Sequence, residues 1–227
     1  MADGELDNPV WSSLHARHRA LALHSGQAVR FPPEFAPFLA VAPDADVAKA
    51  LEELVAADET VYLLGIAPRV PDGWSLRAYR ALAQMVCVDA IEVVDGPDIE
   101  ALTPDHRADV LALTARVYPH YFRERTMDMG RYFGIYCDGR LAAMIGERLA
   151  TSSHVELSAI CTDPDFAGRG YARRLIAMLA NDVLAGGRTP FLHVSRENAR
   201  ALRLYGQIGF RHRPDIGFWS LRRTASA

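Results

Sequence analysis

Three polar side chains alternate along one predicted strand, and they are the first candidates for chemistry in this chain. His154, Glu156 and Ser158 share one face of residues 154–162, while Val155, Leu157, Ala159 and Cys161 share the other, apolar face. This spacing predicts a half-buried strand with a polar face. Burial raises the pKa of a carboxyl group, so Glu156 is a candidate general base near neutral pH, and His154 is the competing base. The alternative for Glu156 is a solvent-facing carboxylate without a task.

A glycine-bearing turn follows this strand and opens a helix. Asp163-Pro164 ends the strand, and Gly168 and Gly170 precede an apolar-periodic run that stops at Gly186-Gly187. Small residues before a helix favour phosphate, because the first N–H groups have no partner within the helix and the helix dipole adds positive potential. The alternative is that these glycines allow close packing of helix and strand. The turn completes neither the lysine-bearing phosphate loop nor the G-x-G-x-x-G motif.

A second motif makes the first more specific. Residues 189–194 predict a short strand. A helix is expected to start within residues 195–198, with Ser195 or Asn198 as its cap, and to end before Gly209-Phe210. Within that helix, Asn198, Ala201 and Tyr205 have the spacing N-x-x-A-x-x-x-Y. Together with the glycine-bearing turn, this segment resembles the GNAT superfamily of N-acetyltransferases.

The turn departs from the family pattern at one position. The family's pyrophosphate-binding turn has the form Q/R-x-x-G-x-G/A, and Gly170 and Ala172 occupy its two small positions. Ala167 stands where the family has a polar residue, so one side-chain contact is missing. The backbone amides, which do most of the binding, are kept.

The resemblance implies an α/β fold, in which helices flank a mixed, mostly antiparallel sheet, and it implies acetyl-CoA (coenzyme A) as the cofactor. Cofactor contacts are expected from the end of the first strand, from the turn and from the second helix. The implied cofactor-binding residues are Ile160, Cys161, Thr162, Ala167, Gly168, Arg169, Gly170, Tyr171, Ala172, Arg173, Asn198, Ala201 and Tyr205.

Acyl transfer to an amine needs a neutral amine, a stabilised oxyanion and protonation of the departing thiolate. The family motif implies Tyr205 as the general acid; the alternative is a core tyrosine with a locally bonded hydroxyl. Glu156 is the candidate base, directly or through water, and a backbone N–H of residues 160–162 would hold the oxyanion. Asn198 binds the pantetheine arm or only caps its helix. The apolar neighbours of Cys161 favour a buried structural thiol over a covalent acyl-enzyme.

These residues lead to one functional hypothesis and one rival. The hypothesis is an N-acetyltransferase that moves an acetyl or other acyl group from acetyl-CoA to a primary amine by direct attack in a ternary complex. The C-terminal motif is similar to glycine N-acyltransferase-like members, which favours a small molecule or an amino acid as acceptor. The rival is an acyl-CoA sensor or interaction module without turnover, which Ala167 and the acidic first half allow. A homodimer is left open.

The charge distribution supports an anionic ligand in the second half of the chain. The 227 residues carry a net charge of −3, and 50% are hydrophobic, which suits a compact protein and disfavours disorder. Residues 1–100 hold 7 basic and 16 acidic residues, whereas residues 101–227 hold 18 and 12. The proposed phosphate site therefore lies in the basic half. A nucleic-acid partner is disfavoured by the net charge.

Location and metal binding are predicted from what the sequence lacks. No apolar run reaches membrane length, the first residues are acidic where a signal sequence would be basic, and Cys87, Cys137 and Cys161 are scattered. We therefore expect a cytoplasmic protein without a membrane partner. No metal is expected, because the only histidine cluster, His15, His18 and His24, lacks a neighbouring carboxylate or cysteine and suits a solvated surface.

The chain is predicted to form two domains, 1–98 and 99–227. The first is expected to contain a helix at 11–24, strands at 27–31 and 38–42, a helix at 44–58, a buried strand at 61–66, and at 74–88 a strand or a strand running into a helix. This order resembles an incomplete, degenerate copy of the acetyltransferase core without its cofactor turn.

The remaining elements complete the second predicted domain. They are an edge-like strand at 91–94, a helix from Thr103 through Val117, a hairpin of 132–137 and 140–149 around Asp138-Gly139, and a last strand at 211–221. The aromatic segment 118–122 follows the helix, where acceptor loops of the superfamily lie. Packing against the helix end is the alternative for this segment.

Overall fold

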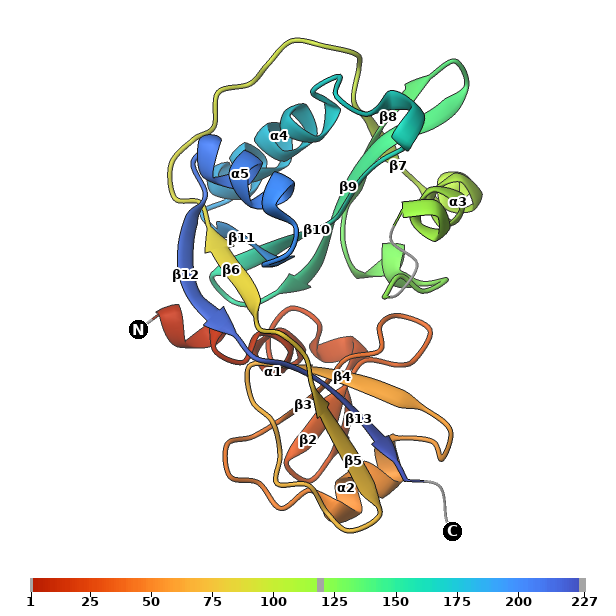
Figure 1. Ribbon diagram of the computed structural model, residues 1–227, viewed down its shortest axis with the longest axis vertical. Helices are drawn as coiled ribbons and strands as arrows, with labels where there is room; N and C mark the ends of the chain where they lie inside the picture. Colours follow the sequence, from red (N-terminus) through yellow and green to blue (C-terminus); the bar gives the residue numbers. More distant parts are fainter. Residues whose placement is uncertain (1, 118–120, 225–227) are drawn as a thin grey trace.

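The protein consists of two lobes stacked along its longest axis (Figure 1). The computed structural model describes residues 2–117 and 121–224. In the orientation of Figure 1, the N-terminal segment begins between the lobes and the C-terminal strand ends in the lower one. The upper lobe holds the segments that the sequence singled out for chemistry.

The upper lobe is one sheet with helices on both faces. Its elements are β6 (Leu82–Val86), β7 (Glu100–Leu102), η3 (Pro104–His106), α3 (Arg107–Val117), η4 (Thr126–Met129), β8 (Tyr132–Cys137), β9 (Arg140–Ala150), β10 (His154–Thr162), η5 (Pro164–Phe166), α4 (Tyr171–Ala185), β11 (Thr189–Ser195), α5 (Ala199–Gln207) and β12 (Arg211–Ile216). The strand order is β12-β6-β11-β10-β9-β8-β7. The β10–β11 pair is parallel and the other neighbouring pairs are antiparallel. The predicted α/β fold with a mixed, mostly antiparallel sheet is confirmed.

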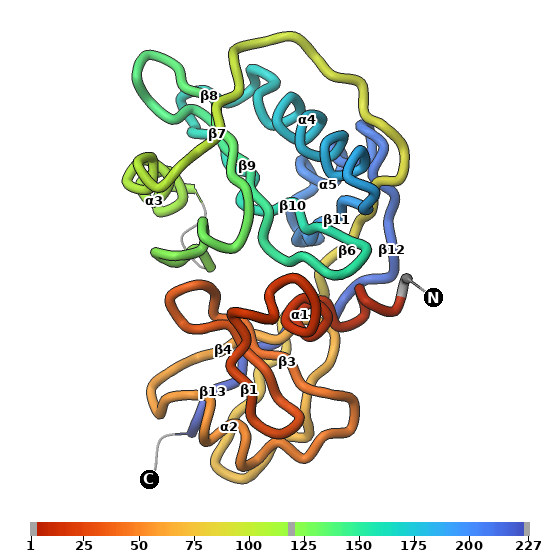
Figure 2. Tube along the Cα trace, turned by 180° about the vertical axis from the view of Figure 1, so that it is seen from behind, coloured from red at the N-terminus to blue at the C-terminus, as the bar shows by residue number. Residues whose placement is uncertain are grey.

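The lower lobe contains two small sheets. Its elements are η1 (Ala2–Leu6), α1 (Pro9–Leu14), η2 (Arg19–Leu21), β1 (Leu23–Ser25), β2 (Ala28–Arg30), β3 (Leu39–Val41), α2 (Ala48–Leu54), β4 (Thr60–Leu64), β5 (Trp74–Ala78) and β13 (Phe218–Arg223). The strand orders are β1-β2-β3 and β4-β13-β5. Figure 2 shows the same lobe from behind, with α1 at the boundary with the upper lobe.

Helix α4 covers one face of the upper sheet because its apolar residues recur at helical spacing. Leu175, Ile176, Leu179 and Val183 are all fully buried and belong to one core cluster with Val155 of β10. Fully burying a side chain of this size contributes roughly 2 kcal/mol. This packing fixes the N-terminus of α4 relative to the end of β10 and so places the glycine-bearing turn.

Two strands cross between the lobes. β6 lies between β12 and β11 in the upper sheet although it precedes residue 98, and β13 lies between β4 and β5 in the lower lobe although it ends the chain. Each lobe is therefore completed by a strand from the other side of the predicted boundary. The domains 1–98 and 99–227 and the degenerate acetyltransferase-like origin of the first half stay predictions.

Three strand predictions need correction or completion. Residues 74–88 form β5 and β6, two strands in different sheets. Residues 91–94 are not a strand, because the side chain of Asn181 replaces a partner strand: its Oδ1 accepts from the Ile91 N–H at 2.8 Å and its Nδ2 donates to the Ile91 carbonyl at 2.8 Å. The last predicted strand, 211–221, is divided at Gly217 into β12 and β13.

The first predicted helix is also shorter than expected. α1 ends at Leu14, residues 15–18 are turns, and η2 and the start of β1 follow before residue 25. His18 is buried, accepts from the Ser13 hydroxyl at 2.7 Å and donates to the Met129 carbonyl at 2.7 Å. The prediction of a solvated surface is therefore wrong for His18, since two local hydrogen bonds satisfy its ring inside the protein.

Candidate active site

Strand β10 contains a bulge at the centre of the upper sheet. Ala159 has φ 50, a value that non-glycine residues rarely adopt, and the register with β9 shifts between Ser158 and Cys161. Val155 and Leu157 pack on the α4 side, whereas Ala159 and Cys161 pack in the cluster that contains α3 residues. The predicted single apolar face is therefore wrong beyond Leu157, because the extra residue of a bulge reverses the alternation.

The bulge accompanies a separation of β10 from β11. In the described chain these strands pair only through His154–Glu156 and residues 189–191, although β10 continues to Thr162 and β11 to Ser195. Beyond the pairing, β10 keeps β9 and β11 keeps β6 as neighbours. One edge of residues 157–161 is thus left without a strand partner, and its backbone groups are available to a ligand.

A cavity of about 500 Å³ lies at this separation, between the two lobes. The upper lobe contributes Val117, Tyr121, Arg148, residues 156–161, residues 193–195, Glu197, Asn198 and Tyr205. The lower lobe and the crossing strands contribute Phe38, Leu64, Tyr79, Arg80, Leu82 and Phe218. Of the predicted site residues, the cavity brings together Glu156, Ile160, Cys161, Asn198 and Tyr205. Thr162, Ala201 and the turn at 167–173 are not among its described lining residues.

The turn before α4 is shaped by backbone conformation. Gly168 and Gly170 both have φ +82, and a Cβ added to either would meet nothing within 4 Å. Close packing therefore does not explain these glycines, while the left-handed backbone does. The first bond inside α4 runs from Arg174 N to Gly170 O at 3.1 Å, so the amides that precede it have no partner within the helix. Open space and free amides fit a pyrophosphate.

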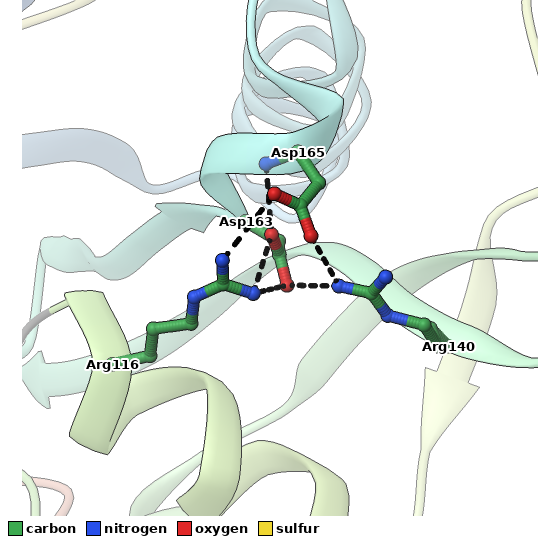
Figure 3. A network of polar contacts seen from close by, with 4 residues as sticks. All are labelled: Arg116, Arg140, Asp163 and Asp165. Carbon is green, nitrogen blue, oxygen red and sulfur yellow. Dashed lines mark hydrogen bonds and ion pairs between the residues drawn. The ribbon is translucent and has the colours of Figure 1, made fainter.

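A network of four charged residues anchors the start of this turn (Figure 3). The Asp163 carboxylate accepts from Arg116 at 2.8 Å and 3.0 Å and from Arg140 at 3.0 Å, and its Oδ1 also accepts from the Asp165 N–H at 2.9 Å. Asp165 is bound by the same two arginines. The network ties the turn to α3 and to the β8–β9 hairpin. Sequence reasoning missed it, because no local spacing connects its four members.

Glu156 lies in the cavity wall but not in the electrostatic state that the sequence suggested. Its side chain is 1% exposed and forms two hydrogen bonds with Arg148, at 2.7 Å and 2.9 Å. Burial by itself would raise the pKa of Glu156, but the charge and hydrogen bonds of Arg148, together with a bond from His193, lower it to about 2. The prediction of a raised pKa is wrong, because the sequence did not reveal the paired cation.

His193 is the functional candidate that sequence reasoning did not select. Its Nδ1–H donates to Glu156 Oε1 at 2.7 Å, and its Nε2 accepts from the Gln84 amide at 2.9 Å. Gln84 in turn accepts from Arg213 at 2.5 Å and donates to the Leu6 carbonyl at 3.0 Å, which fixes its orientation. These hydrogen bonds fix the orientation of the His193 ring, with Nδ1 toward Glu156. The strand that carries His193 was predicted, but no local pattern in the sequence indicated its contact with Glu156.

His154, the competing base, lies outside the cavity lining. Its ring is buried, and its Nδ1 is 3.2 Å from Glu5 Oε2 near the N-terminal segment. Both rings of the pair His154 and Phe191 are buried, with their centroids 6.2 Å apart. Of the two predicted bases, Glu156 is the one that lines the cavity.

The remaining predicted residues combine structural contacts with a place in the cavity wall. Tyr205 is buried, lines the cavity and packs against Phe210, with 5.9 Å between ring centroids. Asn198 caps α5 by accepting from Ala201 N at 3.1 Å, and it also lines the cavity. Burial raises the pKa of the Cys161 thiol to about 12, which agrees with a buried, unreactive thiol.

The predicted aromatic acceptor segment is described in part. Residues 118–120 lie outside the described residues, while Tyr121 lines the cavity. Tyr121 contacts Phe38 and Tyr62 of the lower lobe, with ring centroids 6.2 Å and 5.1 Å away. It thus joins the two lobes at the cavity.

Comparison with known proteins connects this geometry to one family. Residues 132–220 match the family described as FR47-like protein. A crystal structure from Novosphingobium aromaticivorans, described as an acetyltransferase from the GNAT family, is 35% identical, has a TM-score of 0.87 and covers 97% of this chain and 99% of its own. A comparison with curated proteins gave no match.

More distant structures share the fold over nearly their full lengths. A GCN5-related N-acetyltransferase from Kribbella flavida is 14% identical, with a TM-score of 0.64 and coverage of 96% and 95%. A GCN5-related N-acetyltransferase-like protein from Streptococcus suis is 16% identical, with a TM-score of 0.55 and coverage of 98% and 97%.

Among the described residues, no helix has the length and apolar character needed to cross a membrane.

Proposed function

Because the chain belongs to the GNAT family of acetyltransferases, we propose that it transfers the acetyl group of acetyl-CoA to the primary amine of a small molecule, with both bound in one ternary complex. The observation that carries this proposal is the separation of β10 from β11 beyond Glu156, which opens a cavity lined by Tyr205 and Asn198. The cavity is of a size that is typical of small-molecule sites.

The residues around the turn fit the cofactor. Amides at the start of α4 would hold the pyrophosphate, with Gly168 and Gly170 keeping the approach open. Asn198 and the free backbone edge at Ile160 and Cys161 would bind the pantetheine arm. When bound, acetyl-CoA supplies an activated acyl group and a thiolate leaving group. Ala167 adds no polar side chain, so backbone contacts carry the affinity.

Of the two residues that the sequence predicted as acid and base, only Tyr205 is proposed here to transfer a proton. Tyr205 lines the cavity and is the proposed general acid: its phenolic proton would go to the departing thiolate, and the proton that the amine nitrogen loses on forming the amide would restore the phenol. Glu156 was predicted as the base, but a carboxyl with a pKa of about 2 is poorly matched to proton abstraction near neutral pH. We therefore propose that Glu156 is a positioning residue, which fixes the side chains of Arg148 and His193, and that burial in the cavity disfavours the ammonium form of the amine.

The test is release of free thiol from acetyl-CoA over a panel of primary amines. Tyr205→Phe should lower kcat at least tenfold with little change in coenzyme A affinity. Tyr136→Phe is the matched control, because its hydroxyl bonds to Asp109 at 2.8 Å outside the cavity. Coenzyme A binding without turnover on any amine would contradict the proposal.

Glu156→Gln separates the two roles of that residue. A positioning role predicts reduced kcat with an unchanged dependence of kcat on pH. If Glu156 were the base, the substitution would remove the low-pH limb of the profile. Calorimetry of coenzyme A binding provides the control that the variant is folded and still takes the cofactor.

A further inference from the structure

The two sides of the cavity differ in chemistry. One side is formed by β10 and β11, and the opposite side is lined by aromatic rings. We define the aromatic wall as Phe38, Tyr79, Tyr121 and Phe218, which all line the cavity. The rings contact one another: the centroids of Tyr79 and Phe218 are 5.2 Å apart, and those of Tyr121 and Phe218 are 5.9 Å apart. Such offset and edge-to-face contacts are favourable arrangements of aromatic rings.

Two rings of the aromatic wall are positioned by strands of the lower lobe. Phe218 begins β13, and Tyr79 follows β5, so both rings lie where strands pass between the lobes. The Tyr79 hydroxyl is 3.1 Å from Ser220 Oγ, and Tyr62 stacks on Phe218 from outside the cavity lining with centroids 5.7 Å apart. A ligand would therefore meet two rings, Tyr79 and Phe218, that are positioned by their own contacts.

The carboxylates that line the cavity have cationic partners. Glu156 is paired with Arg148, whose guanidinium also lies 4.9 Å from the centroid of the Phe38 ring. Glu197 lies 3.7 Å from Arg80, and both of these side chains are largely exposed. Glu156 and Glu197 are the carboxylates among the described lining residues, and each has an arginine beside it. The cavity therefore offers a ligand with several ammonium groups no carboxylate that lacks a cation. Burying such charges without counter-ions is strongly unfavourable.

We propose that the acceptor is a monoamine with an aromatic or similarly sized apolar body, such as an arylalkylamine. Its body packs on the aromatic wall, and its amine points toward β10 and Tyr205. A polyamine or another polycation is a poorer fit, because the buried carboxylate of Glu156 is already paired with Arg148, and a free glycine leaves the aromatic wall uncovered. This inference rests on the proposed function for turnover but not for binding.

The first experiment compares amines at equal concentration. We expect kcat/KM for phenethylamine to exceed that for spermidine and for glycine at least tenfold, measured by thiol release. A preference for spermidine or glycine would overturn the inference while leaving the transferase function intact. Calorimetric binding of phenethylamine in the presence of coenzyme A is the second readout. Binding without turnover would overturn the proposed function alone, and absence of binding would overturn the inference.

The second experiment substitutes one residue of the aromatic wall. Tyr79→Leu, at the partly exposed edge of the aromatic wall, should raise the Kd for phenethylamine roughly tenfold and leave that for butylamine within about twofold. Phe133→Leu is the matched control, since Phe133 lies on β8 outside the cavity lining and should leave both constants unchanged. Melting temperatures of both variants report whether they fold. An equal increase of both Kd values in Tyr79→Leu would overturn the role of the aromatic wall.

Discussion

Two regions of the upper lobe carry the proposed chemistry, and they are built in opposite ways. The turn before α4 works through its backbone: Gly168 and Gly170 adopt positive φ, and the helix amides lie open. The site around Glu156 works through side chains, because Glu156 is bound by Arg148 and His193 from the two neighbouring strands. The first region depends on residues within one short segment, whereas the second depends on how three strands pair.

This difference decides how each region responds to change. A backbone site loses function when a Cβ alters its conformation, but its energy is spread over several amides. A buried ion pair concentrates its energy in two charges, so removal of one leaves the other without compensation. The predictions that follow test this contrast, beginning with the largest effect.

Arg148→Ala should destabilise the protein most. It leaves the Glu156 carboxylate buried without its principal cation, which costs about 3–5 kcal/mol in the free energy of unfolding. Urea denaturation measures this free energy. The double variant Arg148→Met/Glu156→Leu should recover much of the loss, because an apolar pair needs no counter-ion. A double variant less stable than the single one would contradict this account.

Acid should destabilise the protein through the same pair. The pKa of Glu156 is lowered from 4.5 to about 2, so its contribution is fully present above pH 4.5 and is lost as the pH falls toward 2. The loss is on the order of 3 kcal/mol. Stability curves from pH 7 to pH 2 should show a steeper acid limb in the native protein than in Glu156→Gln. Parallel limbs would show that the folded pKa is not lowered.

Gly170→Ala should have a smaller effect on stability, about 1 kcal/mol, because alanine is strained at φ +82 even where space is open. It should also weaken coenzyme A binding, measured by calorimetry. Gly206→Ala is the matched control: Gly206 lies inside α5, a Cβ there meets nothing within 4 Å, and the change should stabilise by up to about 1 kcal/mol. Equal effects of both substitutions would remove the conformational argument for the turn.

Asn198→Ala should cost about 1 kcal/mol or less, through loss of the cap on Ala201 N. Asn198→Asp keeps a capping oxygen and should restore thermal stability. If Asn198 also holds the pantetheine arm, the aspartate variant will still bind coenzyme A more weakly than the native protein. Affinity that returns together with stability would assign Asn198 to capping alone.

Much of the upper lobe could be predicted because its signals are local. Asp138-Gly139 predicts the β8–β9 hairpin, the buried stripe of α4 has helical spacing, and the turn departs from helical geometry at its glycines. These features depend on a few neighbouring residues, whose steric preferences hold in any context. The crossing of β6 and β13 between the lobes has no such signal, because strand partners are chosen by packing over the whole chain.

The candidate site divides in the same manner. By itself, the sequence identified the segment that forms the turn and placed Glu156, Asn198 and Tyr205 in the same region of the molecule, and these three line one cavity. Only the tertiary structure decided that Glu156 is paired with Arg148, that His193 joins them, and that the aromatic wall, in which Tyr121 of the upper lobe meets rings of the lower lobe, closes the cavity. Backbone conformation follows from local sterics, whereas the pKa of a buried carboxyl follows from charges that folding brings beside it.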